Sequence, residues 1–287
     1  MLALTQSRWV ASHIEQLGWN VPLEIIRTLG DDLAALPTGQ IDTKGLFVNE
    51  IENALLQNRI DLAVHSMKDL PPEMPDGLMI ASVPRREDPR DVLVGRSAPK
   101  LSELPAGSII GSSSPRRRAQ LLASRPDIEV RDLRGNVDTR LRKLDEGQYD
   151  AICIAAAGLN RLGFSGRITE YLDTEVMLPA AGQGALALQV RSNDELAASA
   201  VSTLHHVDSA LAIRAELAVL AALGWGCSVP LGLLAVVNDG RIRLTAALCS
   251  LDGMNVIREQ IDEIASPEDA GLEMARRLKE SGSHLLG

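Results

Sequence analysis

The chain has 287 residues, of which 45% are hydrophobic and 23% are charged, as is typical of a globular protein with two or three domains. Its formal net charge of −9 argues against a general nucleic-acid-binding protein, which is usually basic. The three cysteines, Cys153, Cys227 and Cys249, form an odd and sparse set that favours a reducing compartment over a disulfide scaffold. The sequence has no apolar run long enough to span a membrane and no signal-peptide pattern at its start, so we expect a cytoplasmic protein.

Residues 1–180 alternate strand-like and helix-like segments. Strands are predicted at 23–28, 62–65, 78–83, 108–111, 128–132 and 151–155, and helices at 47–58, 116–124 and 139–146. The prolines and charges of 84–89 indicate a crossing between domains. Strands that alternate with helices predict parallel sheets covered on both faces, here in two similar α/β units.

The C-terminal part of the chain has a different pattern. A helix is predicted over 210–223, with Asp208 as its cap and Gly224 at its end. Three strands are predicted at 231–237, 242–249 and 254–261. The turn Asn238-Asp239-Gly240 is a hairpin signal, and Asp252-Gly253 precedes the third strand.

A final helix is predicted after Ser266, which is placed as its N-cap, with Pro267 at the first helical position and Gly282 at the end. Two helices around an antiparallel meander predict a small α+β domain.

The segment Ser112–Arg118 is the first candidate site, since it follows a predicted strand and opens a predicted helix. Ser114 can cap that helix and Pro115 suits its first turn, so free N–H groups, hydroxyls and the positive helix end would converge there. Its arginines offer planar forks that match carboxylate or phosphate. More basic residues follow at Arg131, Arg134, Arg140, Arg142 and Lys143. A solvated basic face is the alternative, and the serine-rich turn favours an anion site.

The segment His65–Pro72 directly follows a predicted buried strand. Loops beyond the carboxyl ends of strands carry ligand sites in open α/β sheets. Asp69 there could act as an acid, a base or a charge stabiliser. A surface ion pair of Asp69 with Lys68 is the simpler interpretation of the pair taken alone.

The segment Gly224–Pro230 places Cys227 in a glycine-rich turn between a helix and a strand. An accessible thiol there could be a nucleophile or a covalent anchor, whereas a small buried residue is the alternative. Cys153 and Cys249 lie inside predicted strands, where burial is expected. His205 and His206 are adjacent and diverge on any regular element, so no metal site is predicted.

Seven short segments stand in order along almost the whole chain. They are Lys44–Val48, His65–Pro71, Arg86–Asp91, Leu133–Val137, Ala157–Leu159, Leu178–Gly184 and Gly226–Cys227. Each could arise by chance, but together they closely resemble the porphobilinogen deaminase (hydroxymethylbilane synthase) family.

The resemblance implies two periplasmic-binding-protein-like α/β domains with the active cleft between them, and a small C-terminal α+β domain that carries the cysteine. Domain 1 would span 1–84 and 185–203, domain 2 would span 90–180, and domain 3 would span 207–287. The family normally begins with a short strand and a Thr-Arg-x-Ser turn before its first helix. This chain opens at Met1–Gln6 within that helix, so we expect it to be N-terminally short of a strand, an arginine and a serine.

The resemblance further implies a transferase that joins four porphobilinogen molecules head to tail, releases ammonia and gives linear hydroxymethylbilane in tetrapyrrole biosynthesis. Cys227 matches the residue that holds a dipyrromethane cofactor through a thioether. Asp69 matches the catalytic aspartate, which would help to protonate the leaving amine and stabilise cationic intermediates, and Lys68 is a second catalytic candidate. The other expected cofactor-binding residues are Lys44, Ser66, Ser112, Ser113, Ser114, Arg116, Arg117, Arg134 and Arg140, and the expected substrate-binding residues are Arg161, Arg134 and Arg140.

The implied protein is a cytoplasmic monomer with a small-molecule substrate and no nucleic-acid or membrane partner. Trp225 departs from the family pattern, which has a glycine or small residue there. The main alternative function is a non-catalytic binder of organic anions, which would need neither Asp69 nor a group on Cys227. A regulatory protein that uses the arginines on nucleic acid is disfavoured by the acidic balance.

Overall fold

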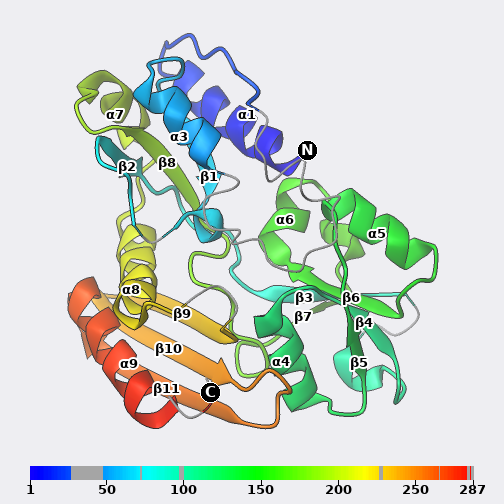
Figure 1. Ribbon diagram of the computed structural model, residues 1–287. Coiled ribbons are helices and arrows are strands. Elements are labelled where there is room, and N and C mark those ends of the chain that lie inside the picture. The colour runs from blue at the N-terminus through cyan, green and yellow to red at the C-terminus, as the bar shows by residue number, and fades with distance from the viewer. Residues whose placement is uncertain are drawn as a thin grey trace. The chain divides into compact units, whose positions relative to one another are not determined.

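The computed structural model of the chain describes residues 1–26, 48–71, 73–96, 100–225, 229–264, 266–282 and 285 (Figure 1). The chain forms two compact units. Unit 1 comprises Met1–Arg86 and Ala185–Ala210, and unit 2 comprises Glu87–Gly184 and Leu211–Gly287. The finer division into three domains stays a prediction. None of the helices in the described ranges is long and apolar enough to cross a membrane.

Unit 1 is a small sheet with helices on both faces. Its elements are α1 (Leu2–Glu15), α3 (Asn49–Leu56), β1 (Ala63–Ser66), β2 (Leu78–Ser82), β8 (Leu186–Arg191) and α7 (Glu195–Ser202). Apolar residues of α1 and α7 pack on one face of the sheet with Leu186 and Leu188. Leu55 of α3 packs with Ala63 and Leu78 in a second cluster. Side chains alternate between the two layers along β1, since Val64 packs against the first cluster and Ala63 belongs to the second.

Two predictions for unit 1 are wrong. The strand order is β1-β8-β2 with antiparallel pairing on both sides of β8, so the sheet is not the parallel one expected. The central strand comes from more than 100 residues further along the chain, and local patterns cannot reveal such an insertion. The strand predicted at 23–28 is also absent over its described part, 23–26, where Ile25 is exposed.

Unit 2 contains a larger three-layer α/β part. Its elements are β3 (Asp91–Gly95), β4 (Ile109–Gly111), α4 (Pro115–Ser124), β5 (Glu129–Arg131), α5 (Val137–Asp145), β6 (Ala151–Ala155), α6 (Ala156–Arg161) and β7 (Glu170–Tyr171). The strand order is β5-β4-β6-β3-β7. Leu121 of α4 packs on one face of the sheet, while α5 and α6 cover the other.

The strand directions in this sheet bring several loops to one edge. Strand β4 is parallel to β5 and β6, so the carboxyl ends of these three strands coincide. Strand β3 runs antiparallel to β6, and Asp91 at its start pairs with Ala155 at the end of β6. The sheet is therefore mixed, and the start of β3 joins the loops after β4, β5 and β6.

The C-terminal part of unit 2 is the α+β arrangement expected. Its elements are α8 (Val207–Leu223), whose first turn belongs to unit 1, β9 (Leu231–Asn238), β10 (Arg241–Cys249), β11 (Val256–Ile264) and α9 (Pro267–Gly282). The sheet order is β11-β10-β9, antiparallel throughout, and its apolar face packs with α8 and α9. The fold-class prediction, α/β plus α+β with a three-stranded antiparallel sheet, is confirmed.

Of the turns and caps predicted for this part, the structure confirms the hairpin turn and the Ser266 cap but not the Asp208 cap. Asp239 and Gly240 both have positive φ, 50° and 73°, as a two-residue hairpin turn requires, which confirms the hairpin. Ser266 accepts the N–H of Asp269 at 3.2 Å, which confirms its N-cap. The Asp208 cap is wrong, because α8 begins at Val207 and Nδ1 of His206 accepts the N–H of Ser209 in the first turn at 3.2 Å.

Candidate active site

In unit 1, the predicted catalytic carboxylate lies on a single turn of 3₁₀ helix, Met67–Asp69, directly after β1. Met67 is buried and its N–H donates to the carbonyl of Ala185 at 3.0 Å, which ties the turn to the segment leading into β8. Lys68 and Asp69 are both exposed. Surrounding protein atoms nonetheless displace enough water to raise the pKa of Asp69, while Lys68 opposes that rise. The turn thus presents a carboxyl that holds its proton more readily than an ordinary aspartate.

The strand beneath this turn is fixed by buried polar contacts. The Gln6 amide on α1 donates to Oγ of Ser66 at 3.0 Å. Nε2 of His65 lies 2.8 Å from Oε1 of Gln189, whose amide nitrogen donates to Glu52 at 2.9 Å. Because the amide N–H faces a carboxylate, its oxygen faces the imidazole, which places a proton on Nε2 of His65. Burial lowers the pKa of His65 to about 4, with the Gln189 bond opposing, so the ring is neutral at physiological pH.

In unit 2, the serine-rich loop after β4 caps α4 as predicted. Oγ of Ser114 accepts the N–H of Arg117 at 3.4 Å, and Pro115 occupies the first turn. Oγ of Ser113 accepts the N–H of Leu133 at 2.9 Å, and the N–H of buried Ser112 donates to the Arg131 carbonyl. In this structure the Ser113 hydroxyl and the Ser112 backbone fasten the loop after β4 to β5 and the residues that follow it.

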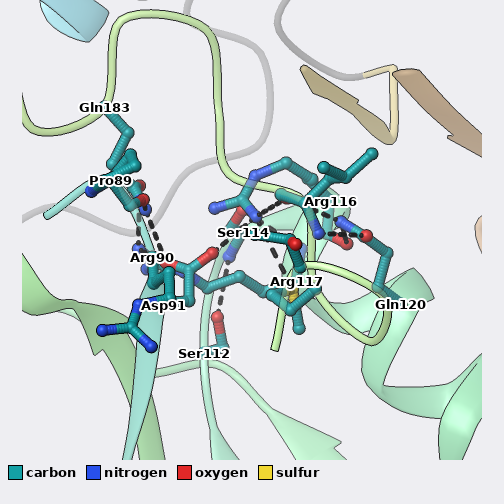
Figure 2. Close-up of polar contacts among 12 residues, drawn as sticks. Pro89, Arg90, Asp91, Ser112, Ser114, Arg116, Arg117, Gln120 and Gln183 are labelled. Atoms are coloured by element: carbon teal, nitrogen blue, oxygen red, sulfur yellow. Dashed lines mark hydrogen bonds and ion pairs between the residues drawn. The ribbon is translucent and has the colours of Figure 1, made fainter. Parts of the chain in front are cut away.

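Figure 2 shows a buried ion cluster at the same edge of the sheet, formed by Asp91, Arg116, Arg117 and Gln183. Oδ2 of Asp91 accepts from Nη1 of Arg116 at 2.6 Å. Oδ1 accepts from Nε of Arg117 at 2.9 Å and from the Gln183 amide at 2.9 Å. Nη1 of Arg116 also donates to the Leu178 carbonyl at 2.6 Å. One carboxylate thus orders two guanidinium groups.

The charges of this cluster do not cancel. Burial alone would raise the pKa of Asp91, but Arg116 and Arg117 hold it well below its usual range, so Asp91 is an anion. Burial would lower the pKa of Arg117, but Asp91 outweighs this and raises it. Burial, reinforced by Asp91, raises the pKa of the nearby Cys153 thiol to about 12, so the thiol supplies no second negative charge. Two cations therefore share one anion.

A third guanidinium, that of Arg140, adds to this positive charge. Its Nε donates to the Gly135 carbonyl at 2.7 Å. Burial and then repulsion by Arg117 lower the pKa of Arg140 to about 10, so it is still protonated at neutral pH. Among the residues that the structure describes, no acidic side chain forms an ion pair with Arg140. Arg116, Arg117 and Arg140 against Asp91 leave two positive charges in excess.

The two remaining predicted arginines lie on neighbouring loops of unit 2. Arg161, at the end of α6, donates from Nη2 to the Gly184 carbonyl at 2.7 Å. Burial lowers its pKa, and Glu87 partly offsets this. Arg134 is half-buried, and its carbonyl accepts from Nζ of Lys143 at 3.3 Å.

Other members of the basic cluster belong to the solvated face that was the alternative interpretation. Arg131 pairs with Glu129 and Arg142 pairs with Glu146, all four side chains being exposed. Arg118 donates to the Val130 carbonyl. The structure therefore divides the basic run into a buried group around Asp91 and an ordinary surface.

Several candidate residues can be placed only in part. Lys44 and Cys227 lie outside the described residues. Trp225, two positions before Cys227, is half-buried against the apolar core of the C-terminal part. Cys153 and Cys249 are fully buried, as the simpler interpretation predicted.

Pattern reasoning missed Asp91 and Gln183 as members of the cluster. Both lie in segments that carried the family resemblance, but neither stands in a recognisable site pattern. The available signal was an aspartate at the first position of an otherwise apolar strand, where an acidic side chain needs a partner once buried.

The fold and this cluster define a mixed α/β protein with ordered guanidinium groups that carry an excess of positive charge. Excess guanidinium charge of this kind fits a ligand with several carboxylates, because each arginine can bind a carboxylate with two parallel bonds. The donor set therefore fits a polycarboxylate pyrrole cofactor.

Comparison with known proteins then gives the particular family. Residues 1–199 match the model "Porphobilinogen deaminase, dipyromethane cofactor binding domain", and residues 210–280 match "Porphobilinogen deaminase, C-terminal domain". The chain belongs to the porphobilinogen deaminase family.

Individual relatives are similar over nearly the full length. The porphobilinogen deaminase of Thermus thermophilus is 50% identical over 285 residues, which cover 98% of this chain and 93% of the relative. That of Geobacillus kaustophilus is 47% identical, with 99% and 93% covered. Among solved structures, a putative methionine-binding lipoprotein from Bacillus subtilis is similar at a TM-score of 0.42 and 11% identity, over 69% of this chain and 84% of that one. A similarity of that size says nothing about function.

Proposed function

We propose that this chain joins four porphobilinogen molecules head to tail, with loss of ammonia at each step, to give linear hydroxymethylbilane. It is a transferase of tetrapyrrole biosynthesis by family, and the observation that carries the proposal is the excess of ordered guanidinium charge around Asp91. Each porphobilinogen has an acetate and a propionate, so a growing chain accumulates carboxylates. Several fixed cations are needed to hold such a chain.

Arg116, Arg117, Arg134 and Arg140 would hold the carboxylates of the cofactor and the growing chain. Arg134, Arg140 and Arg161 would hold those of the substrate. The lowered pKa of Arg140 supports its role in binding a carboxylate. Its buried charge is repelled by Arg117, and a carboxylate bound beside it would stabilise the charged form. Ser112, Ser113 and Ser114 would act through the loop that they order. Lys44 and Ser66 would contribute further donors.

Asp69 would handle the proton and the charge of the reaction. At each step a carbon–carbon bond forms between the free α-carbon of the terminal pyrrole and the aminomethyl carbon of the substrate, and the carbon–nitrogen bond breaks to release ammonia. The α-carbon then loses its proton, which restores the neutral pyrrole. The raised pKa of Asp69 supports a carboxyl that can give a proton to the leaving amine and, once ionised, stabilise the positive charge left on the pyrrole. Lys68, beside it, would tune the charge of that carboxyl.

The dipyrromethane cofactor, when bound, supplies the pyrrole carbon to which the first substrate is joined. Cys227 would hold it through a thioether. We also propose that the protein is a cytoplasmic monomer of three domains, in which residues 1–84 and 185–203 form the first, 90–180 the second and 207–287 the third. The sparse cysteines favour the reducing compartment.

The direct test is porphobilinogen consumption with ammonia release, followed by detection of the linear tetrapyrrole. Asp69→Asn should lower turnover by about a hundredfold or more, since general acid–base groups typically contribute 10²–10⁴-fold. Asp76→Asn is the matched control, because Asp76 is an exposed aspartate of the same unit. Equal turnover by the Asp69 and Asp76 variants would remove Asp69 from the mechanism.

The non-catalytic anion binder is not favoured by the comparisons, in which relatives matched over nearly the whole chain are enzymes by name. It predicts saturable porphobilinogen binding without ammonia release, which the same assay measures.

A further inference from the structure

Among the described residues, Asp91 is the acidic side chain that pairs with both Arg116 and Arg117, and the proposed reaction gives it no part. It is 0% exposed and stands at the first position of β3. Each of its oxygens binds one guanidinium. Oδ2 accepts from Nη1 of Arg116, and Oδ1 accepts from Nε and Nη2 of Arg117. A single carboxylate therefore fixes the relative orientation of both groups.

Asp91 is itself held from a second direction. The Gln183 amide donates to Oδ1 of Asp91 at 2.9 Å and to the Pro89 carbonyl at 2.7 Å (Figure 2). The preceding residue, Gly182, donates its N–H at 2.7 Å to Glu216, a fully buried carboxylate on α8. Buried polar contacts thus run from α8 through residues 182 and 183 to Asp91.

The ion pairs leave part of each guanidinium available. Nη1 of Arg117 and both Nε and Nη2 of Arg116 have no hydrogen-bond partner among the described residues. Asp91 therefore engages one side of each arginine and leaves N–H donors on the other. A ligand carboxylate would meet donors that are already oriented, so little side-chain entropy remains to be lost on binding.

We infer that Asp91 is a positioning residue for this site, which holds the guanidiniums of Arg116 and Arg117 in the orientation that binds the carboxylates of the pyrrole chain. This inference rests on the proposed function. Asp91 acts through the two arginines and need not touch the substrate. Gln183 acts indirectly on the same arginines, because its amide donates to Asp91 and fixes the position of that carboxylate.

Positioning and simple charge attraction predict opposite effects when Asp91 loses its charge. Arg116, Arg117 and Arg140 against Asp91 carry two positive charges in excess, and Asp91→Asn raises this excess to three. Attraction alone would then strengthen the binding of an anionic substrate and lower KM. If orientation matters more, KM rises and kcat falls. The amide NH₂ of asparagine is a donor and cannot accept from a guanidinium N–H, so one arginine loses the contact that fixes its orientation.

The experiment measures kcat and KM for porphobilinogen in Asp91→Asn and Gln183→Met, with Ser108→Ala as the control. Ser108 is a buried residue of the same unit, just before β4, whose hydroxyl donates to the Pro105 carbonyl at 2.7 Å and not to Asp91 or its arginines. We expect kcat/KM to fall roughly 100-fold in Asp91→Asn and about tenfold in Gln183→Met. The control should stay within about twofold.

A second readout follows the guanidinium groups themselves. In ¹⁵N-labelled protein, the Nε–H of Arg117 should give a sharp, slowly exchanging NMR signal, because it is buried against Asp91. Gln183→Met and Asp91→Asn should broaden this signal or speed its exchange, and Ser108→Ala should not. If Asp91→Asn does not fold, Gln183→Met, which keeps every charge, decides the question by both readouts.

The outcomes separate the inference from the function on which it rests. If the unaltered chain neither binds nor consumes porphobilinogen, the proposed function fails. If the unaltered chain is active and Asp91→Asn has an unchanged or lower KM with normal kcat, positioning by Asp91 is refuted. An equal loss in Gln183→Met and Ser108→Ala would show only general damage to the fold, and would also overturn the inference.

Discussion

The buried histidine beneath the proposed catalytic turn should make unit 1 sensitive to acid. His65 is 6% exposed and its pKa is lowered to about 4, against an ordinary value of 6.5 in the unfolded chain. Between these two values the unfolded chain binds a proton that the folded chain excludes. The stability that His65 contributes is therefore fully present above pH 6.5 and is lost as the pH falls toward 4.

The size of this loss follows from the two pKa values. At pH 5 the linkage amounts to about 2 kcal/mol, since each pKa unit corresponds to about 1.4 kcal/mol and most of the difference lies above pH 5. At pH 8 this loss is close to zero. His65→Asn keeps an N–H donor for Gln189 but does not titrate, so its stability should fall about 2 kcal/mol less than that of the parent between pH 8 and pH 5.

The assay is native-state hydrogen exchange of the β8 segment at pH 8 and pH 5, corrected for the intrinsic exchange rate. This segment reports on unit 1 because β8 is the central strand of its sheet. Gln189→Met is the control, because it removes the partner of His65 while keeping the imidazole, and so should retain the acid sensitivity of the parent. An identical loss of stability in the parent and in His65→Asn would refute the reasoning.

Three further predictions concern unit 2. Gly184→Ala should destabilise it by roughly 2 kcal/mol or more, measured as a lower Tm, because the new Cβ at φ +87° would lie 2.5 Å from the Glu87 carbonyl oxygen; an unchanged Tm would contradict this geometry. Cys153 and Cys249 should resist iodoacetamide in the folded protein and react in urea, since both are buried with pKa values raised to about 12 and about 11; peptide mapping that finds either one modified without urea would show that it is accessible. Arg140→Met should raise the KM for porphobilinogen about tenfold or more, and a KM equal to that of the parent would exclude a carboxylate contact.

Local chemistry was sufficient to predict the turns and most caps. The positive φ values of Asp239 and Gly240 and the Ser114 and Ser266 caps depend on residues within a few positions of one another, so the sequence shows them directly. The same holds for the strand at Ala151–Ala155, whose apolar run has clear ends.

Long-range contacts were beyond the reach of such patterns. Strand β8 enters the unit 1 sheet between β1 and β2 from a distant part of the chain, which turned an expected parallel sheet into an antiparallel one. The pairing of Asp91 with arginines 25 and 26 residues away likewise depends on the antiparallel placement of β3. A buried charge and its partners are set by the tertiary fold, and spacing along the sequence does not encode them.

In the proposed reaction, a chain of pyrroles bound through their carboxylates grows from the sulfur atom of Cys227. The most direct measurement is intact mass spectrometry with peptide mapping of the protein purified from a host that makes porphobilinogen, before and after added substrate. We expect a two-pyrrole adduct on Cys227 that gains pyrrole units when porphobilinogen is supplied. An unmodified Cys227 that gains no mass with substrate would contradict it.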